Sequence, residues 1–303
     1  MGGYSIFKET IADMTWPAVD EAARRKAIML VPIAVIEQHG PHLPLATDIY
    51  GAYLLSVRIR AELAEAGVEA LVAPPYYFGM NPTTAMFTGS LHIDRETMVT
   101  ILAQLLLNYY RWGFEQQFIL NHHGDPTHND AIMEAIRAVR SQGVDAVYTM
   151  GGFVQQFIEE GYASAFHKPL PLPESALLRA PESEATRLAR ERLTKSALHV
   201  HAEEFETSMI MRWYPDVLDP EAEVENLVPV LPTPQEFDQA IQAGKWRELS
   251  PAGYIGDPSV ATPETGELYA LEAADIAQAI VAWLDRQHGG SAPPSGGVST
   301  GRQ

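Results

Sequence analysis

The sequence contains no cysteine. Disulfide bonds, thiolate catalysis and cysteine-bound zinc are therefore excluded. Any metal that this protein binds must be held by histidine, aspartate or glutamate side chains. The missing cysteine does not by itself assign the chain to a compartment.

Basic residues are also scarce, with 21 lysines and arginines against 39 acidic residues and a formal net charge of −18. Such a chain repels phosphate backbones and anionic membranes, so we expect no nucleic-acid partner and no membrane partner. No apolar run reaches the roughly 18–20 residues of a membrane span. The opening stretch "MGGYSIFKETIADMTW" lacks the apolar segment of a secretory signal, and we expect a cytoplasmic protein.

An apolar fraction of 46% in 303 residues is enough for a large core. Because no stretch has the composition of an interdomain linker, we expect a single domain over residues 1–288. Residues 289–303 are rich in glycine, serine and proline, which predicts a disordered tail.

Apolar runs and amphipathic segments alternate along the first half of the chain. The pattern predicts strands at 26–37, 68–79, 114–124 and 144–153, and helices at 49–67, 94–113 and 128–143. Further helices are expected at 204–215 and 264–287, with helix and loop over 154–197. Pro32 weakens the first strand prediction, because proline cannot donate to a sheet ladder. Strands that alternate with helices predict an α/β fold with a mainly parallel sheet.

Candidate metal ligands follow the first predicted strand. Glu37 and His39 are two residues apart, so in a strand they would share one face. Asp48 lies just before the next predicted helix, and the loop between is long enough to bring it back to this pair. The carboxyl edge of an open α/β sheet is where ligands bind.

Two more polar clusters complete the set. "NHHGDPTHN" follows the third predicted strand and contains His122, His123, Asp125 and His128. "HVHAEEFETS" contains His199, His201, Glu203, Glu204 and Glu206. If the first and third strands are neighbours, the first two clusters converge. Mixed histidine and carboxylate ligands suit Zn²⁺, Mn²⁺ or Fe²⁺ better than Ca²⁺ or Mg²⁺, and two ions could share a hydroxide.

The motif "EQHGPHLPLATD" (37–48) closely resembles the signature of the creatininase (creatinine amidohydrolase) family, with Ala46 in place of glycine. "FTGSLHIDRETM", "ILNHHGD", "HAEEFETS" and "AGYIGDPSVATPETGE" resemble later blocks of that family in the same order. The resemblance covers roughly residues 10–285. It implies a three-layer α/β/α sandwich, a homo-oligomer that is often a hexamer, and a dinuclear metal centre that hydrolyses amide C–N bonds.

Matched position by position, the resemblance implies that Glu37 and His39 each bind one metal and that Asp48 bridges both. His123 would bind the ion on the Glu37 side. The fifth ligand would be Glu206 or Asp125, and we rank Glu206 first. His201 matches a histidine that transfers a proton to the leaving nitrogen, and Asp125 is a second candidate for a catalytic role. His42 is expected to support the site rather than to bind metal.

Three blocks depart from the family pattern. Thr84 stands where the family often has a histidine, His122 replaces a glycine with extra residues such as His128 after it, and "HAE" replaces H-A-G. These changes indicate a retained metal centre with an altered substrate pocket, so His122 and His128 are candidate substrate contacts. Trp213 and Trp246 are equally compatible with a place in the core.

The sequence therefore predicts a metal-dependent amidohydrolase that uses two divalent ions, Zn or Mn with Fe as a third candidate. The expected substrate is a small-molecule amide, cyclic or formamide-like, cleaved by a metal-bridging hydroxide. One alternative is a peptidase that trims a small modified peptide. Another is a metal-binding scaffold or sensor without turnover. A closed pocket would favour the small amide, and a long open cleft would favour the peptide.

Overall fold

A computed structural model describes residues 4–151 and 172–287. Its centre is a five-stranded sheet in the order β2-β1-β3-β4-β5, and every neighbouring pair is parallel. The strands are β1 (Ile28–Ile33), β2 (Ala70–Val72), β3 (Gln116–Asn121), β4 (Asp145–Met150) and β5 (Leu177–Arg179). From β1 the chain continues to β2 on one side of the sheet and then to β3 on the other side, so β1 and β3 flank the point where the connections change direction. In open α/β sheets, ligands bind beyond the carboxyl ends of the strands at such a point.

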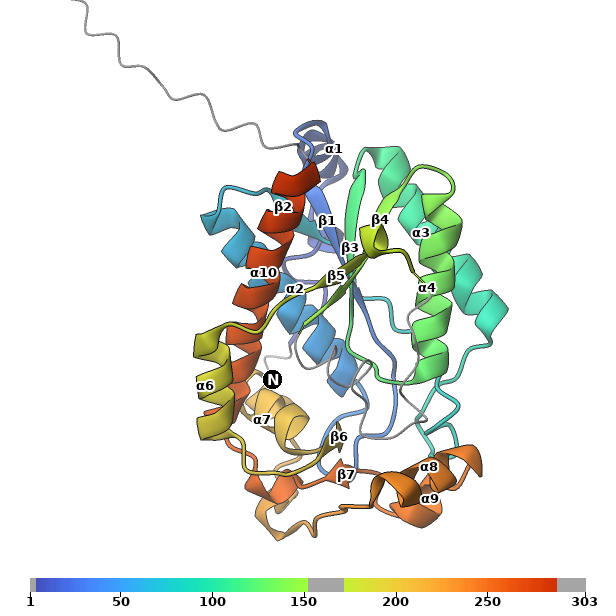
Figure 1. The fold of residues 1–303 in the computed structure, drawn as a ribbon, viewed down its shortest axis with the longest axis vertical. Helices are drawn as coiled ribbons and strands as arrows, with labels where there is room; N and C mark the ends of the chain where they lie inside the picture. The colour runs from blue at the N-terminus through green and yellow to red at the C-terminus, as the bar shows by residue number, and fades with distance from the viewer. Residues whose placement is uncertain (1–3, 152–171, 288–303) are drawn as a thin grey trace, which may run out of the picture.

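Helices cover both faces of this sheet (Figure 1). α3 (Arg95–Trp112) and α4 (Pro126–Arg140) pack on one face, together with α1 (Trp16–Arg24). α2 (Thr47–Glu65) and α10 (Leu268–Gln287) cover the other face. This confirms the predicted three-layer α/β/α arrangement with a parallel sheet.

β1 is buried along its whole length. Met29, Val31 and Ile33 contribute to the core on the α3–α4 side, while Ile28 and Leu30 contribute to the core on the α2–α10 side. A strand buried on both faces reads as a continuous apolar run, which is why β1 is visible in the sequence. Pro32 is tolerated because its missing N–H faces the β2 side of the sheet, where β2 has already ended at Val72.

A group of short elements outside the three layers lies beyond the carboxyl ends of the strands. The antiparallel pair β6 (His199–His201) and β7 (Ile255–Gly256) lies there with the short helices α8 (Pro234–Gln242) and α9 (Trp246–Leu249), at the bottom of Figure 1. α6 (Glu184–Leu193) leads into β6 and packs against α10, and α7 (Glu204–Trp213) follows β6. The chain from 172 onward therefore places His201 and Trp246 over the edge of the sheet.

The predicted elements are present, and their ends differ. The first strand stops at Ile33 rather than at residue 37, because the following backbone bonds to loops: the N–H of Glu37 donates to the carbonyl of Leu45, and the carbonyl of Ile36 accepts from Leu91. The prediction that Glu37 and His39 share a strand face was wrong. The second strand is also much shorter than predicted.

Helix caps explain several of the other boundaries. Asp94 caps α3 through the N–H of Thr97, and Gly113 ends it with a φ of 110°, as expected. α2 begins at Thr47, so Asp48 lies within its first turn and not before it. The predicted tail at 289–303 and residues 154–171 of the predicted helix and loop region lie outside the described residues. The prediction of helix and loop alone over 154–197 was wrong, because strand β5 lies in its described part and pairs with β4.

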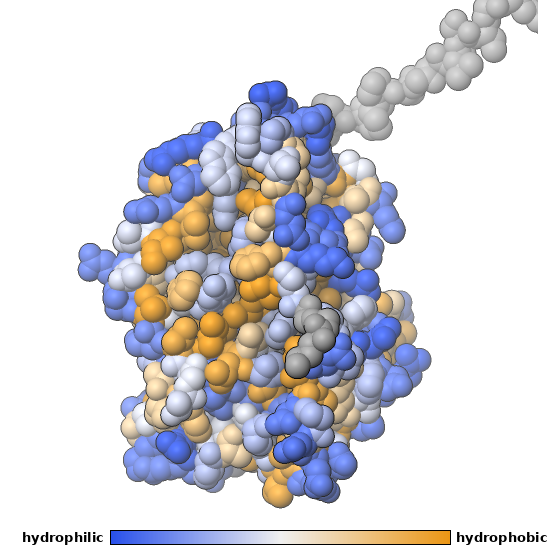
Figure 2. Space-filling model, turned by 180° about the vertical axis from the view of Figure 1, so that it is seen from behind, coloured by the Kyte–Doolittle hydropathy of each residue, from blue (hydrophilic) through white to orange (hydrophobic). Residues whose placement is uncertain are grey.

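Figure 2 shows, from behind, an apolar area in the middle of the surface with hydrophilic residues around it. Among the described helices, none is both long enough and apolar enough to cross a membrane.

Candidate metal centre

The loop after β1 presents Glu37 and His39 from a fixed backbone. The N–H of Gln38 donates to Ser90 Oγ at 3.0 Å, and Gly40 turns the chain with a φ of 68°. A side chain on Gly40 would also come within 2.9 Å of His42 Nδ1. His39 Nδ1 lies 3.1 Å from the carbonyl oxygen of Glu37, where it can only donate. His39 Nε2 is therefore the nitrogen that faces the centre.

Asp48 reaches residues from both neighbouring strand ends. Its Oδ1 lies 3.2 Å from His39 Nε2, and its Oδ2 lies 3.1 Å from His123 Nδ1. The first turn of α2 holds it there, where the positive end of the helix dipole favours a carboxylate. One carboxylate thus faces two separate ligand sets, as the bridging prediction requires.

His123 follows β3 and lies beside Glu37. Its Nδ1 is 2.8 Å from Glu37 Oε1. Asn121 holds this turn, since its side-chain amide donates to the carbonyl of His123 at 2.7 Å and accepts the N–H of His123 at 3.2 Å. The pairing of β1 with β3 brings the two strand ends together, as the sequence predicted.

Glu206 reaches the centre from α7. Its Oε2 lies 3.7 Å from His39 Nε2 and accepts a short hydrogen bond from the N–H of Ala202. Three groups of described side chains have ligand atoms within 4.8 Å of one another. One consists of Glu37, His39 and His201. The other two, called the two triads below, are Glu37, Asp48 and His123, and His39, Asp48 and Glu206. Asp48 belongs to both.

All five of these side chains are buried. Burial alone would lower the pKa of His39, but Asp48 and Glu206 together raise it well above its usual value. His123 behaves in the same way, because Glu37 and Asp48 outweigh its burial. Burial would raise the pKa of Asp48, yet the surrounding histidines hold it well below its ordinary range. Asp48 is therefore charged in the interior and needs cations beside it.

The donor set fits two divalent metal ions. Asp48 Oδ2 makes no hydrogen bond in the described residues although it lies 3.1 Å from His123, as expected for two ligands that point at a common position. Three carboxylates carry three negative charges. Two divalent ions would neutralise them and leave one positive charge for an anion or a polarised carbonyl. Histidine with carboxylate is a donor set for Zn²⁺, Mn²⁺ or Fe²⁺.

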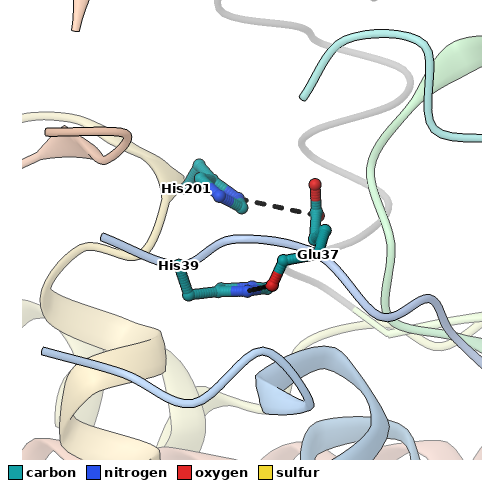
Figure 3. Close-up of side chains that lie close together, drawn as sticks. All are labelled: Glu37, His39 and His201. Atoms are coloured by element: carbon teal, nitrogen blue, oxygen red, sulfur yellow. Dashed lines mark hydrogen bonds and ion pairs between the residues drawn. The ribbon is translucent and has the colours of Figure 1, made fainter. Parts of the chain in front are cut away.

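His201 lies beside this centre, as Figure 3 shows with Glu37 and His39. Its Nε2 lies 2.7 Å from the carbonyl oxygen of Gln38 and 3.1 Å from the side-chain nitrogen of the same residue, and the shorter contact assigns it a proton that it donates to the carbonyl. Its Nδ1 lies 3.8 Å from Glu37 Oε1. The ring of Trp246 packs edge-on against it, with the ring centroids 5.6 Å apart. His201 therefore presents Nδ1 to the space in front of Glu37.

Asp125 lies outside both triads. Its Oδ1 accepts from Thr127 N at 2.8 Å and from His128 N at 3.4 Å, which caps the N-terminus of α4, and its Oδ2 accepts from Thr83. Between the two candidates for the fifth ligand, the geometry favours Glu206.

His122 and His128 lie behind the ligands. His122 Nε2 is 3.1 Å from Tyr269 Oη, and its Nδ1 is 3.7 Å from Asp48. It packs so closely on α2 that a side chain on Gly51 would come within 2.5 Å of it. His128 is fully buried edge-on against the ring of His123. Neither lines the pocket beside the triads, and substrate contact by either stays a prediction.

The other members of the third polar cluster do not face the centre. His199 pairs with Glu203, and Glu204 accepts hydrogen bonds from the N–H groups of Lys195 and Ser196. His42 is buried, which is the main reason that its pKa is lowered to about 4, and its Nε2 is 3.0 Å from Thr207 Oγ1. It supports α7 from beside the site, in keeping with the expected role.

Two residues near the centre have roles that the sequence did not reveal. Thr84 Oγ1 donates a short hydrogen bond to Glu37 Oε2, so it orients a ligand. Trp246 lines the pocket and packs on His201, whereas Trp213 lies half-buried against the core on the α2–α10 side. The sequence shows that Thr84 stands where the family often has a histidine. Its contact with Glu37 could not be predicted, because it depends on how the 81–90 segment folds back over the site.

The sequence profile of the creatininase family, described as creatinine amidohydrolase, matches residues 12–281. The chain belongs to the creatininase family. Two curated relatives are named mycofactocin precursor peptide peptidase. The Mycobacterium ulcerans protein is 24% identical over 89% of this chain and 86% of its own length. The Mycolicibacterium smegmatis protein is 26% identical over 86% of this chain and 87% of its own length.

Solved creatininase structures share the fold. One creatinine amidohydrolase superposes with a TM-score of 0.63 at 18% identity, covering 93% of this chain and 99% of its own. Another, described as the Mn form, has a TM-score of 0.60 at 17% identity and covers 92% and 98%. A variant described as the Zn–Zn type has a TM-score of 0.56 at 18% identity and covers 94% and 99%.

Proposed function

We propose that this protein is a metal-dependent hydrolase that cleaves an amide C–N bond at the centre formed by the two triads. The observation that carries the proposal is the sharing of Asp48 between two buried ligand sets. Glu37, Asp48 and His123 would hold one ion, and His39, Asp48 and Glu206 the other. Creatininase structures described as Mn and Zn–Zn forms support divalent metal use by this family.

The chemistry follows from what each part supplies. Divalent ions bound at the triads would lower the pKa of water and polarise the substrate carbonyl. An amine leaves readily only when it is protonated, and the Nδ1 of His201 faces the space where that proton is needed. The backbone carbonyl of Gln38 accepts the Nε2 proton of His201, so Nδ1 would take up the proton that the attacking water loses and pass it to the leaving nitrogen. Trp246 packs against the ring of His201.

The relatives favour a peptide substrate. Both of the long matches described above carry the name of a peptidase for a peptide precursor, and both span most of this chain. The expectation of a non-peptide substrate competes with these names, so the peptidase alternative becomes the first candidate.

The small cyclic or formamide-like amide is the second candidate, and the pocket favours it. The space beside the Glu37 triad is only about 40 Å³. It accepts a small group next to the scissile bond, whereas a peptide would need to extend beyond it.

Metal analysis and activity together test the proposal. Protein purified without chelators should contain about two equivalents of transition metal, and chelation should abolish hydrolysis that Mn²⁺ or Zn²⁺ restores. Asp48→Ala should lose both ions and all activity while keeping the fold. Hydrolysis of the mycofactocin precursor peptide, compared with that of creatinine, separates the two substrate classes. Protein without bound metal that neither ion rescues would refute the enzyme, and metal binding without turnover would point to the scaffold or sensor.

A further inference from the structure

The pocket beside the metal centre has a second set of polar groups that the proposed chemistry does not use. Glu37, His123 and His201 belong to the centre. Asp125 and Thr83 also line the same pocket. Neither belongs to a triad, yet the side chain of Asp125 is only 4% exposed. A buried carboxylate outside the metal sites needs a further explanation.

Asp125 cannot turn away from its present orientation. Its Oδ1 accepts from the backbone N–H of Thr127 at 2.8 Å, from the hydroxyl of Thr127 at 2.6 Å and from the N–H of His128 at 3.4 Å. From the part of the chain that the structure describes, its Oδ2 accepts one hydrogen bond, from the hydroxyl of Thr83 at 2.5 Å. A carboxylate oxygen accepts two hydrogen bonds readily, so Oδ2 keeps acceptor capacity on the side that it shares with Thr83.

Thr83 adds no donor to this side of the pocket. A hydroxyl has one proton, and Thr83 donates it to Asp125, so only lone pairs remain for a ligand. The indole N–H of Trp246 is likewise used, because it donates to the carbonyl of Gly253 at 3.0 Å. Asp125 and Thr83 therefore offer hydrogen-bond acceptors to a ligand. Neither of them, nor Trp246, has a polar side-chain proton left to donate.

We propose that Asp125 and Thr83 form an acceptor site that binds an N–H group of the substrate next to the cleaved carbonyl. This inference rests on the proposed function, and it narrows the substrate class. The enzyme would select amides with an unsubstituted N–H at that position, such as secondary peptide bonds or unsubstituted lactams. It would reject N-alkylated amides, because the buried carboxylate of Asp125 would then be left without the donor, which is costly.

Acetohydroxamate is a suitable probe, because it binds divalent metals through its oxygens and keeps an N–H. N-methylacetohydroxamate differs only by a methyl group on that nitrogen. Isothermal titration calorimetry on the metal-loaded protein should show about ten- to hundredfold tighter binding of the N–H compound, the factor expected for a hydrogen bond to a charged group. Equal affinity for the two compounds would overturn the proposal.

Asp125→Asn separates hydrogen bonding from simple crowding by the methyl group. Asparagine still caps a helix, but its amide places a donor where the carboxylate had an acceptor. The preference for the N–H compound should vanish, while metal content and melting temperature stay at the wild-type level. Thr83→Ser keeps the hydroxyl and should keep the wild-type preference. Persistence of the preference in Asp125→Asn would show a steric cause and sink the proposal.

A second variant protects the test against misfolding. Asp125→Ser also keeps a capping side chain and removes the carboxylate, so it should lose the preference as well. Failure of the acceptor site and failure of the proposed function give different results. A protein that binds both hydroxamates equally in a metal-dependent way refutes only the acceptor site, whereas a protein that binds neither with metal present refutes the metal centre too.

Discussion

Asp48 is the residue that the two triads share. Its two oxygens face His39 and His123, which come from different strand ends. The spacing from Glu37 to Asp48 in the sequence predicted this return, and the structure brings Glu37, His39, Asp48 and His123 together. The fifth position could not be decided from the sequence alone, because the family resemblance implies Asp125 when it is matched to some members and Glu206 when it is matched to others.

The two candidates for the fifth ligand give a paired prediction. Glu206→Gln should lose about one equivalent of metal, because the triad with His39 would keep only one charged oxygen donor. Asp125→Asn should keep both equivalents, since Asp125 is engaged at the start of α4. Metal content measured by plasma mass spectrometry checks both variants. Loss of metal from the Asp125 variant alone would reverse the assignment.

Thr84 offers a test of ligand orientation. Its hydroxyl donates to Glu37 Oε2, and Thr84→Val removes this bond with little change in shape. Metal affinity on the Glu37 side should fall about 10–100-fold, as for other groups that orient metal ligands. Thr84→Ser should bind like the wild type. Competition with a chelator of known affinity measures the change, and an unchanged Thr84→Val would show that Glu37 is held by other contacts.

At the scale of elements, the site depends on where strands stop and helices start. β1 and β3 pair in parallel, so their carboxyl ends meet. The apolar runs predicted both strands, but β1 ends before Glu37 because its later hydrogen bonds go to loops rather than to the sheet. A strand boundary depends on tertiary partners, and these are absent from a local pattern.

The turn between β6 and α7 has a backbone feature that the sequence conceals. Ala202 adopts a φ of 51°, in the left-handed region that costs an L-residue roughly 1–2 kcal/mol. This conformation lets its N–H donate to Glu206 while His201, one residue earlier, faces Glu37. One strained residue thus orients a candidate ligand and a candidate proton donor.

Substitutions at Ala202 should separate conformation from side-chain size. Ala202→Gly adopts the left-handed region freely and should keep stability within about 1 kcal/mol, with metal content intact. Ala202→Val places a branched side chain in that region at a buried position, and should cost about 2–4 kcal/mol and weaken metal binding. Chemical denaturation and metal analysis measure both effects. Equal stability of the two variants would contradict this account.

At the scale of the whole molecule, the buried acids couple stability to metal and to pH. The surface is strongly acidic, but the interior holds its own concentrated negative charge in the two triads. Without metal, protons on His39 and His123 balance that charge, since the pKa of each is raised well above the usual value. The predicted homo-oligomer stays a prediction at this scale.

The metal-free protein should therefore lose stability in alkali. The contribution of His39 and His123 is complete below the ordinary histidine pKa of 6.5 and is lost as the pH rises through their raised values. Asp48, whose pKa is held well below 3.8, contributes above that value and loses its contribution only in strong acid. Bound metal replaces the protons, so it should preserve stability in alkali.

Melting temperatures with and without chelator test this coupling. The difference between the loaded and metal-free protein should widen as the pH rises above about 6.5, because the pKa values of His39 and His123 are raised above it. Asp48→Asn is the control, because it removes the shared charge and should flatten the pH dependence of the metal-free state. A difference that does not change with pH would show that the histidines are not protonated in the metal-free fold.

The alternation of strands and helices, and the clusters that contain Glu37, His39, Asp48 and His123 at two strand ends, followed from the residues alone. The three layers and the choice of these four residues as ligands followed from the resemblance to the creatininase family. Apolar periodicity and short-range spacing are local properties, and they are read without knowledge of the fold. Packing of the folded chain supplied the rest. It places Glu206 rather than Asp125 beside His39 and Asp48, and it brings Thr84 to Glu37 and Trp246 to His201. It also puts Asp125 and Thr83 in one pocket. Each of these depends on side chains from distant segments that meet only after the chain has packed. The acceptor pair also depends on which oxygen of Asp125 is already hydrogen-bonded by Thr127 and His128.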